Sequence, residues 1–282
     1  MRRAKRLGRP ALLDPDLFKS PHFRLGISQQ TLQQIALGGL MIVLPIYLQM
    51  VHEYNALEAG LSIAPLSISM FVVALIAGRK GGGVRPSTFV RYGFLMLAIG
   101  VAAIIALVPR VDTGLGLALP LIVAGSGLGL LVSQLNNYTL APVSEERVSE
   151  AASVNSAAGS FGLSFGLAAV GAVMLATLAA AFTQLSDDSD VLTEPEKTEV
   201  AVVLEEDAQI MTNTALEAQL ADKPEATQAE IIDINTDARH IALQIALVIP
   251  LLVALGGLVN SFRMARLPDV ESSGEHPGLV VG

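Results

Sequence analysis

Six long stretches of the sequence carry no charged residue and are mostly apolar. A helix needs about 20 such residues to cross a hydrocarbon core about 30 Å thick. Buried helices of soluble proteins rarely exceed about 18 uncharged residues, so six in one chain predict six membrane-spanning helices. We expect one in each of the runs 25–51, 59–78, 92–109, 113–144, 151–186 and 241–262.

The predicted fold class is therefore all-α: an integral membrane six-helix bundle, with five helices in residues 25–182 and the sixth in 239–262. The composition agrees, because 52% of the residues are hydrophobic and only 5% are aromatic. A mean hydropathy of +0.55 is too high for an ordinary soluble domain. The lipid bilayer is thus the first expected partner.

Lysine and arginine are distributed unevenly over the predicted loops. Cytoplasmic loops retain positive charge during insertion, and placing the N terminus inside puts fourteen of the eighteen basic residues on the cytoplasmic side. We therefore expect a multi-pass protein of the plasma membrane with both termini in the cytoplasm. Residues 1–24 would form a basic cytoplasmic segment, and the polar tail 263–282 would be disordered.

Fifteen of the twenty-six acidic residues lie in segment 183–238. This segment is expected to form a small helical insertion on the outer side, with a solvated acidic linker as the alternative. Pro195 suits a first helical turn, and two further helices are expected with a break near Pro224. The apolar positions at helical spacing are Val200, Val203, Leu204, Ala208 and Met211, then Leu216, Leu220, Ile231, Ile232 and Ile234.

Enzymatic chemistry finds little support in the sequence. The chain has no cysteine, which excludes disulfides, thiolate metal sites and thiol catalysis. Its four histidines are scattered, so no metal or cofactor is expected. Ser126 lies in a Gly-Ser-Gly context that would suit a hydrolase, but no histidine lies in a predicted span to serve as its base. No glycine-rich turn continues into Gly-Lys-Ser/Thr, so ATP hydrolysis is not expected.

Amide side chains inside two of the predicted spans are the candidate solute path. Polar groups are costly in hydrocarbon unless they meet a partner or water. The first hypothesis is a cytoplasm-facing vestibule for a polar solute, and the second is hydrogen bonding between helices or placement at the interface; both remain open. The residues are Gln29, Gln30, Gln33 and Gln34 in the first span and Gln134, Asn136 and Asn137 in the fourth.

Small residues in the fourth and fifth spans predict close helix packing, with a sliding surface as a second interpretation. These are Gly125, Gly127 and Gly129, then Gly159, Gly162 and Gly166.

A basic turn surrounds the glycines at 81–83, between the second and third spans. We expect it to lie against anionic headgroups rather than to bind nucleic acid. Its residues are Arg79, Lys80, Arg85 and Arg91.

Several short segments, in this order and spacing, resemble the fourteen-helix drug:proton antiporters of the major facilitator superfamily. The segments are LDPDLF at 13–18, LPIYLQ at 44–49, ALEAG at 56–60, VSQLNN at 132–137, SEER at 144–147, the small-residue stretch 151–166 and NSFR at 260–263. The resemblance implies the second six-helix bundle of a carrier that exports small molecules in exchange for protons. Solute and protons are then the partners expected for the full-length carrier.

The sequence departs from that family in two ways. The turn at 78–85 lacks the aspartate of the family's repeated cytoplasmic motif, so the gating role that the resemblance implies for Arg79 and Arg85 does not follow for this chain, and contact with headgroups is the remaining role for them. The resemblance also covers the second bundle only, whereas the family's proton-coupling residues lie in the first. Transport by alternating access needs two bundles that rock against each other, so we expect the chain alone not to pump.

Two alternatives remain at this point. One is a half-transporter that pairs with itself or with a separate partner across its first, second, fourth and fifth helices. The other is a non-transporting membrane protein whose acidic outer segment binds a partner.

Overall fold

The computed structural model describes residues 15–80, 84–197 and 212–268, and all regular structure within them is helical. Six helices are long and apolar enough to cross a membrane, which confirms the predicted fold class. They are α2 (Pro21–Met50), α3 (Ala56–Lys80), α4 (Pro86–Leu107), α5 (Ala118–Leu140), α6 (Val148–Asp188) and α9 (Glu225–Ala265). Short elements lie between them: η1 (Pro15–Lys19), η3 (Val108–Arg110), η4 (Gly114–Leu117), η5 (Glu145–Arg147) and α8 (Asn213–Gln219).

Local capping chemistry explains why α2 begins before its uncharged run. The Ser20 hydroxyl accepts a hydrogen bond from the Phe23 amide at 3.4 Å, and Pro21 occupies the first helical position. A serine cap followed by proline is a favourable helix start. The helix therefore includes Arg24, because charge limits the part that enters hydrocarbon and does not limit the helix itself.

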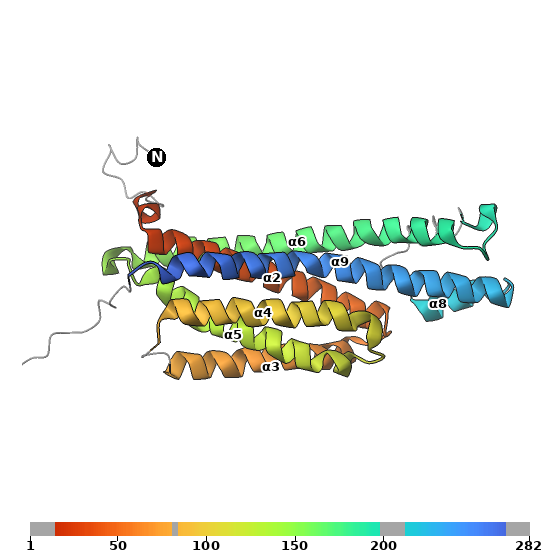
Figure 1. Cartoon of the computed structure of the whole chain (residues 1–282), viewed down its shortest axis with the longest axis horizontal. Helices are drawn as coiled ribbons and strands as arrows, with labels where there is room; N and C mark the ends of the chain where they lie inside the picture. Colours follow the sequence, from red (N-terminus) through yellow and green to blue (C-terminus); the bar gives the residue numbers. More distant parts are fainter. Residues whose placement is uncertain (1–14, 81–83, 198–211, 269–282) are drawn as a thin grey trace, which may run out of the picture.

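Helix α2 holds the bundle together. It packs along α6 and α9 and over a shorter length on α5, whereas α3 packs mainly on α5, and α4 packs on both α5 and α9. Helices α5 and α6 make few contacts with each other. Figure 1 shows α6 and α9 running side by side along one edge, with α4, α5 and α3 on the other. A space therefore remains between α5 and α6.

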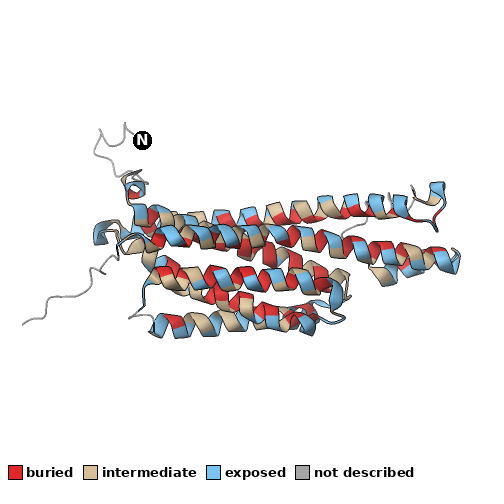
Figure 2. Cartoon of the chain, in the orientation of Figure 1, coloured by how far each residue is buried: buried red, intermediate tan, exposed pale blue. Residues whose placement is uncertain are grey.

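Helix α3 is the least covered of the spanning helices. Only 17% of its most apolar window is buried, compared with 50% in α2. Its large side chains Leu57, Leu61 and Phe71 are exposed, and exposed residues are abundant on the outward faces of the other helices as well (Figure 2). Such apolar faces need lipid or another protein to cover them.

Helices α6 and α9 are longer than a bilayer requires. Each has 41 residues, about 60 Å at the standard rise per residue, whereas the hydrocarbon core is about 30 Å thick. Both extend past the other helices at one end of the bundle (Figure 1). The predicted boundaries at residues 183 and 239 therefore lie within continuous helices. We call the end of the bundle where α6 and α9 extend past the other helices the acidic end. The opposite end, which carries Arg24, Arg85 and Arg263, is the basic end.

The two ends of the described chain meet at the basic end. The His22 ring nitrogen Nε2 lies 2.9 Å from the Pro268 carbonyl oxygen. This contact agrees with six membrane-spanning helices, because an even number of crossings returns the chain to the side from which it started.

At the acidic end, the extensions of α6 and α9 form a small helical layer with α8. Leu216 of α8 and Ile231 and Ile234 of α9 are buried, and the Asn235 side chain donates to Asn213 Oδ1 at 2.7 Å. Pro224 precedes α9 as its N-cap residue. Leu220 is also buried, and Ile232 is partly buried. The expected apolar positions Val200, Val203, Leu204, Ala208 and Met211 lie outside the described residues.

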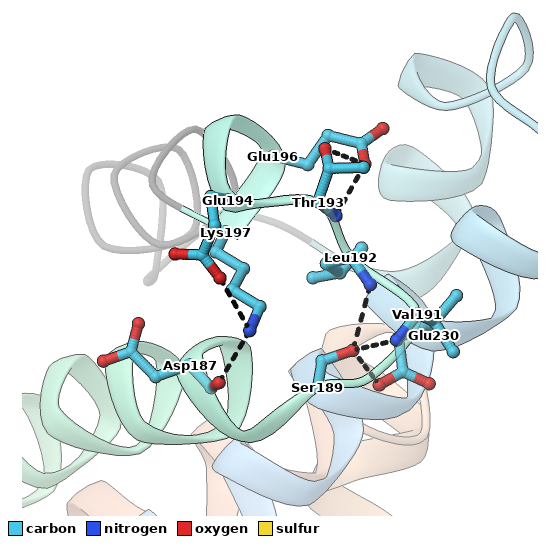
Figure 3. A network of polar contacts seen from close by, with 9 residues as sticks. All are labelled: Asp187, Ser189, Val191, Leu192, Thr193, Glu194, Glu196, Lys197 and Glu230. Atoms are coloured by element: carbon cyan, nitrogen blue, oxygen red, sulfur yellow. Dashed lines mark hydrogen bonds and ion pairs between the residues drawn. The ribbon is translucent and has the colours of Figure 1, made fainter.

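A hydrogen-bond network joins the end of α6 to α9 (Figure 3). The Ser189 hydroxyl donates to Glu230 Oε1 at 2.5 Å and accepts from the backbone amides of Val191 and Leu192. The Lys197 ammonium donates to the Asp187 carbonyl at 2.9 Å. This network satisfies polar groups where α6 ends and fixes the turn that follows it.

The loop between α2 and α3 is also attached to this layer. The carboxylate of Glu53 accepts hydrogen bonds from the backbone amide of Thr214, at 2.8 Å, and from its hydroxyl. Glu53 has a φ of 53°, in the left-handed region that is unfavourable for a side-chain-bearing residue. The contact with α8 therefore compensates a strained loop conformation.

Candidate functional site

A polar groove of about 400 Å³ lies between α2, α5 and α6. It is in the half of the bundle nearer the basic end. Its lining is Gln30, Gln33 and Gln34 from α2, Val132 and Asn136 from α5, and Asn155, Ser156, Gly159, Ser160 and Leu163 from α6.

Close approaches of small residues create this groove. Gly26 of α2 lies against Thr139 of α5, and Gly162 and Gly166 of α6 lie against the α2 carbonyl oxygens of Thr31 and Ile35. Helix α2 is thereby held to both neighbours, while α5 and α6 remain largely apart. The space left between them is the groove.

The groove contains buried amides whose hydrogen bonds are incomplete. Asn155 is 6% exposed and Gln33 is 1% exposed. The Asn155 Nδ2 donates to Asn136 Oδ1 at 3.1 Å and links α6 to α5. Among the described residues, Asn155 Oδ1, Gln33 Nε2 and Gln34 Oε1 have no hydrogen-bond partner. Buried polar atoms usually have partners, so unpaired ones around a cavity favour a site that binds a ligand or water.

The structure brings together only some of the residues predicted for the solute path. Gln30, Gln33, Gln34 and Asn136 line the groove. Gln29 instead points to α9, where its Nε2 donates to the Gly257 carbonyl at 3.0 Å and contacts Met264 Sδ at 3.4 Å. Gln134 donates to the Ala77 carbonyl of α3 at 3.4 Å, and Asn137 is exposed outside the groove lining.

Sequence reasoning missed the contribution of α6. Asn155, Ser156 and Ser160 line the groove, but in the sequence they lie among the glycines and alanines whose pattern predicts helix packing. The rule applied to the glutamines of α2 would also have identified Asn155, because a buried amide in a span needs a partner.

Five of the six predicted packing glycines lie at close backbone approaches. Gly125 and Gly129 of α5 face α3 at the carbonyls of Leu66 and Met70, and Gly127 faces α4 at the Gly93 carbonyl. Gly162 and Gly166 face α2, as described above. The exception is Gly159, where an added Cβ would meet its nearest atom at 3.5 Å, an ordinary contact. Gly159 therefore provides space in the groove.

The predicted basic turn is spread over several contacts at the basic end. Arg79 is exposed, Arg85 donates to the Leu267 carbonyl at 3.4 Å, and the Arg91 guanidinium lies 4.5 Å from the centre of the Phe262 ring. Two of these arginines thus contact the last part of α9 or the residues directly after it. The side chain of Lys80 and residues 81–83 lie outside the described residues.

A second cavity, of about 300 Å³, lies toward the acidic end between α2, α6 and α9. Most of its lining is apolar, including Ile46, Met174 and Leu178, and Arg239 is its charged member. The Arg239 Nε donates to Asn235 Oδ1 at 3.1 Å. No group of three metal-binding side chains occurs in the part of the chain that the structure describes.

The fold is a six-helix membrane bundle with a polar groove on its face, and the sequence comparisons define its class. The family model of the Major Facilitator Superfamily matches residues 3–167, more than half of the chain. The chain therefore belongs to the Major Facilitator Superfamily. The match includes the groove residues and ends within α6, so the acidic end of the long helices lies beyond it.

The curated relatives include bacterial multidrug transporters. The chain is 28% identical over 145 residues to the probable multidrug resistance protein EmrY of Escherichia coli, covering 51% of this chain and 28% of that protein. It is 28% identical to the multidrug resistance protein Stp of Mycobacterium tuberculosis, covering 60% and 31%. It is 30% identical to the multidrug export protein EmrB of Escherichia coli, covering 54% and 31%. The matches span about a third of the length of these relatives.

Proposed function

We propose that this chain is the C-terminal bundle of a proton-coupled exporter of drugs or other small molecules, of the fourteen-helix antiporter branch. It moves solute across the membrane and does not transform it chemically. The polar groove between α2, α5 and α6 forms part of the solute path.

The observation that carries this proposal is the set of incompletely bonded amides around the groove. Asn155 and Gln33 are almost fully buried, yet each keeps an atom unpaired among the described residues. Gln29 also has an unpaired Oε1, but it packs against α9 and lies outside the groove lining. What distinguishes Gln33 and Asn155 is that their unpaired atoms belong to side chains that line a cavity. Membership of a transporter family and the names of the relatives support the same proposal.

Alternating access requires a second bundle. We propose that this second bundle, from the complete transporter or from a second copy of the chain, covers the groove side of the molecule together with α3. The exposed apolar side chains Leu57, Leu61 and Phe71 of α3 suit such a contact. Cysteine crosslinking in membranes, starting from a chain without native cysteine, tests the choice: a specific homodimer supports a half-transporter.

The protein is proposed to lie in the plasma membrane with its basic end in the cytoplasm. Single cysteines at the exposed positions Val84 and Glu225 test this orientation. In intact cells, an impermeant maleimide should label Glu225→Cys, and it should label Val84→Cys only after permeabilisation. The reverse pattern would contradict the proposed orientation.

The groove is tested by efflux of the uncharged fluorescent dye Nile red from cells that express the complete transporter of which this chain forms a bundle. The double variant Asn155→Leu with Gln33→Leu should reduce efflux about fivefold or more, because each substitution removes groups that can form hydrogen bonds with the solute. Asn137→Leu is the matched control, because Asn137 is an exposed amide outside the groove. Normal efflux by a double variant present at wild-type amounts would refute the role of the groove.

A further inference from the structure

The groove has a distinctive chemical character: its polar groups are all neutral. Amides, hydroxyls and two apolar side chains line it. Among the residues that the structure describes, no aspartate, glutamate, lysine, arginine or histidine belongs to the lining. A charged group that entered would therefore find no counter-charge here.

This absence argues against a charged ligand. Burial of an ammonium or a carboxylate is costly unless an opposite charge or several hydrogen bonds compensate it. The charges near the basic end lie outside the lining: Arg85 contacts a backbone carbonyl just after α9, and Arg91 lies over Phe262. Arg147 and Glu150, near the start of α6, form an ion pair with each other at 3.5 Å. The groove is therefore suited to an uncharged group.

The unpaired atoms indicate which uncharged group. Gln33 offers an N–H donor, while Asn155 and Gln34 offer carbonyl acceptors, and none has a partner among the described residues. A primary or secondary carboxamide carries one carbonyl acceptor and at least one N–H donor, so it can complete both kinds of bond at once.

Apolar surface lies beside these amides. Val132 from α5 and Leu163 from α6 complete the lining. A ligand with an aromatic or aliphatic body next to its amide would bury that body against these two side chains, which is the usual composition of small-molecule sites.

We propose that the groove binds an uncharged carboxamide group attached to an apolar body, and that it discriminates against cationic and anionic forms of the same body. The inference rests on the proposed function, since it names the class of solute that this part of the path accepts. Asn155 and Gln33 are the residues that determine the preference.

Three probes that share one body test this. They are 2-naphthamide, the 2-naphthyltrimethylammonium ion and 2-naphthoate, added to the purified full chain in lipid nanodiscs. The chain has no tryptophan, so naphthalene fluorescence and its anisotropy can be followed without interference from that residue. Partitioning into lipid is subtracted with empty nanodiscs.

The amide should bind about tenfold more tightly than either ion, and Asn155→Leu and Gln33→Leu should each weaken it about five- to tenfold, the loss expected for one hydrogen bond. Asn137→Leu is the control, and its affinity should equal that of the wild type. Asn155→Asp keeps an acceptor in the same shape and adds a negative charge, so it should largely retain amide binding and strengthen ammonium binding until the ion is preferred. A misfolded variant could not produce that exchange of preference.

The results separate failure of the inference from failure of the proposed function. If an ion binds as tightly as the amide and loses affinity in Asn155→Leu, the groove is a ligand site and the proposed solute class is wrong. If no probe shows binding that depends on Asn155 or Gln33, the groove is not a ligand site, and the inference falls together with the proposed solute path.

Discussion

Two glycines of α6 that face the same helix should respond oppositely to one added methyl group. A Cβ at Gly162 would lie 2.7 Å from the Thr31 carbonyl oxygen, and ordinary contact begins at 3.4 Å, so the helices must separate by about 0.7 Å. The obstacle is backbone, which cannot rotate aside. At Gly159 the nearest atom is Gln30 Nε2 at 3.5 Å, so the methyl group fits without movement.

The expected magnitude follows from these distances. Replacing glycine by alanine favours a helix by up to about 1 kcal/mol, and this gain is common to both variants. Overpacking typically costs about 1–3 kcal/mol. Gly162→Ala should therefore be about 1–3 kcal/mol less stable than Gly159→Ala, measured as the free energy of unfolding in a titration with sodium dodecyl sulfate. Equal stability of the two variants would refute the packing role assigned to Gly162.

Two further predictions concern single polar side chains. Gln29→Leu should have a free energy of unfolding about 0.5–1.5 kcal/mol lower than that of Gln33→Leu. Each variant removes one unpaired amide atom, but only Gln29→Leu also removes a hydrogen bond, the one to the Gly257 carbonyl. Equal free energies of unfolding would contradict this assignment. For Glu53, slight burial acts to raise the pKa, but the hydrogen bonds from Thr214 and its neighbours outweigh it and lower the pKa below 4.5. The attachment of α8 should thus be complete above pH 4.5 and be lost as the pH falls below it. Its loss should be seen as faster hydrogen exchange in α8. Glu53→Gln should abolish this pH dependence, and the same pH dependence of exchange in the variant would count against the role of the carboxylate.

Much of the fold was predictable from local composition. Six uncharged apolar runs predict six spanning helices because the bilayer imposes one length requirement on each segment separately. Helix ends were less predictable, since Ser20 and Pro21 start α2 through a local cap that an analysis of charge does not consider. The acidic segment was expected to be a small helical insertion, and the structure shows in addition that α6 and α9 run without a break through its expected boundaries.

The candidate site was predictable only in kind. The sequence identifies buried amides as informative, because the cost of an amide in hydrocarbon depends on the residue type and its depth. It could not separate Gln29 from Gln33, which lie one helical turn apart on α2 and face different neighbours: α9 for Gln29 and the groove for Gln33. That separation depends on which helices pack on each side of α2.

The sequence by itself thus determined the number of spanning helices, the all-α class and the concentration of amides and small residues in particular spans, because each follows from short segments and the bilayer. The tertiary structure alone decided which amides meet. Asn136 and Asn155 are joined across α5 and α6, and the groove exists because glycine contacts draw α2 to both helices while those two remain apart. Such an arrangement is a property of three helices packed together, and no single segment encodes it.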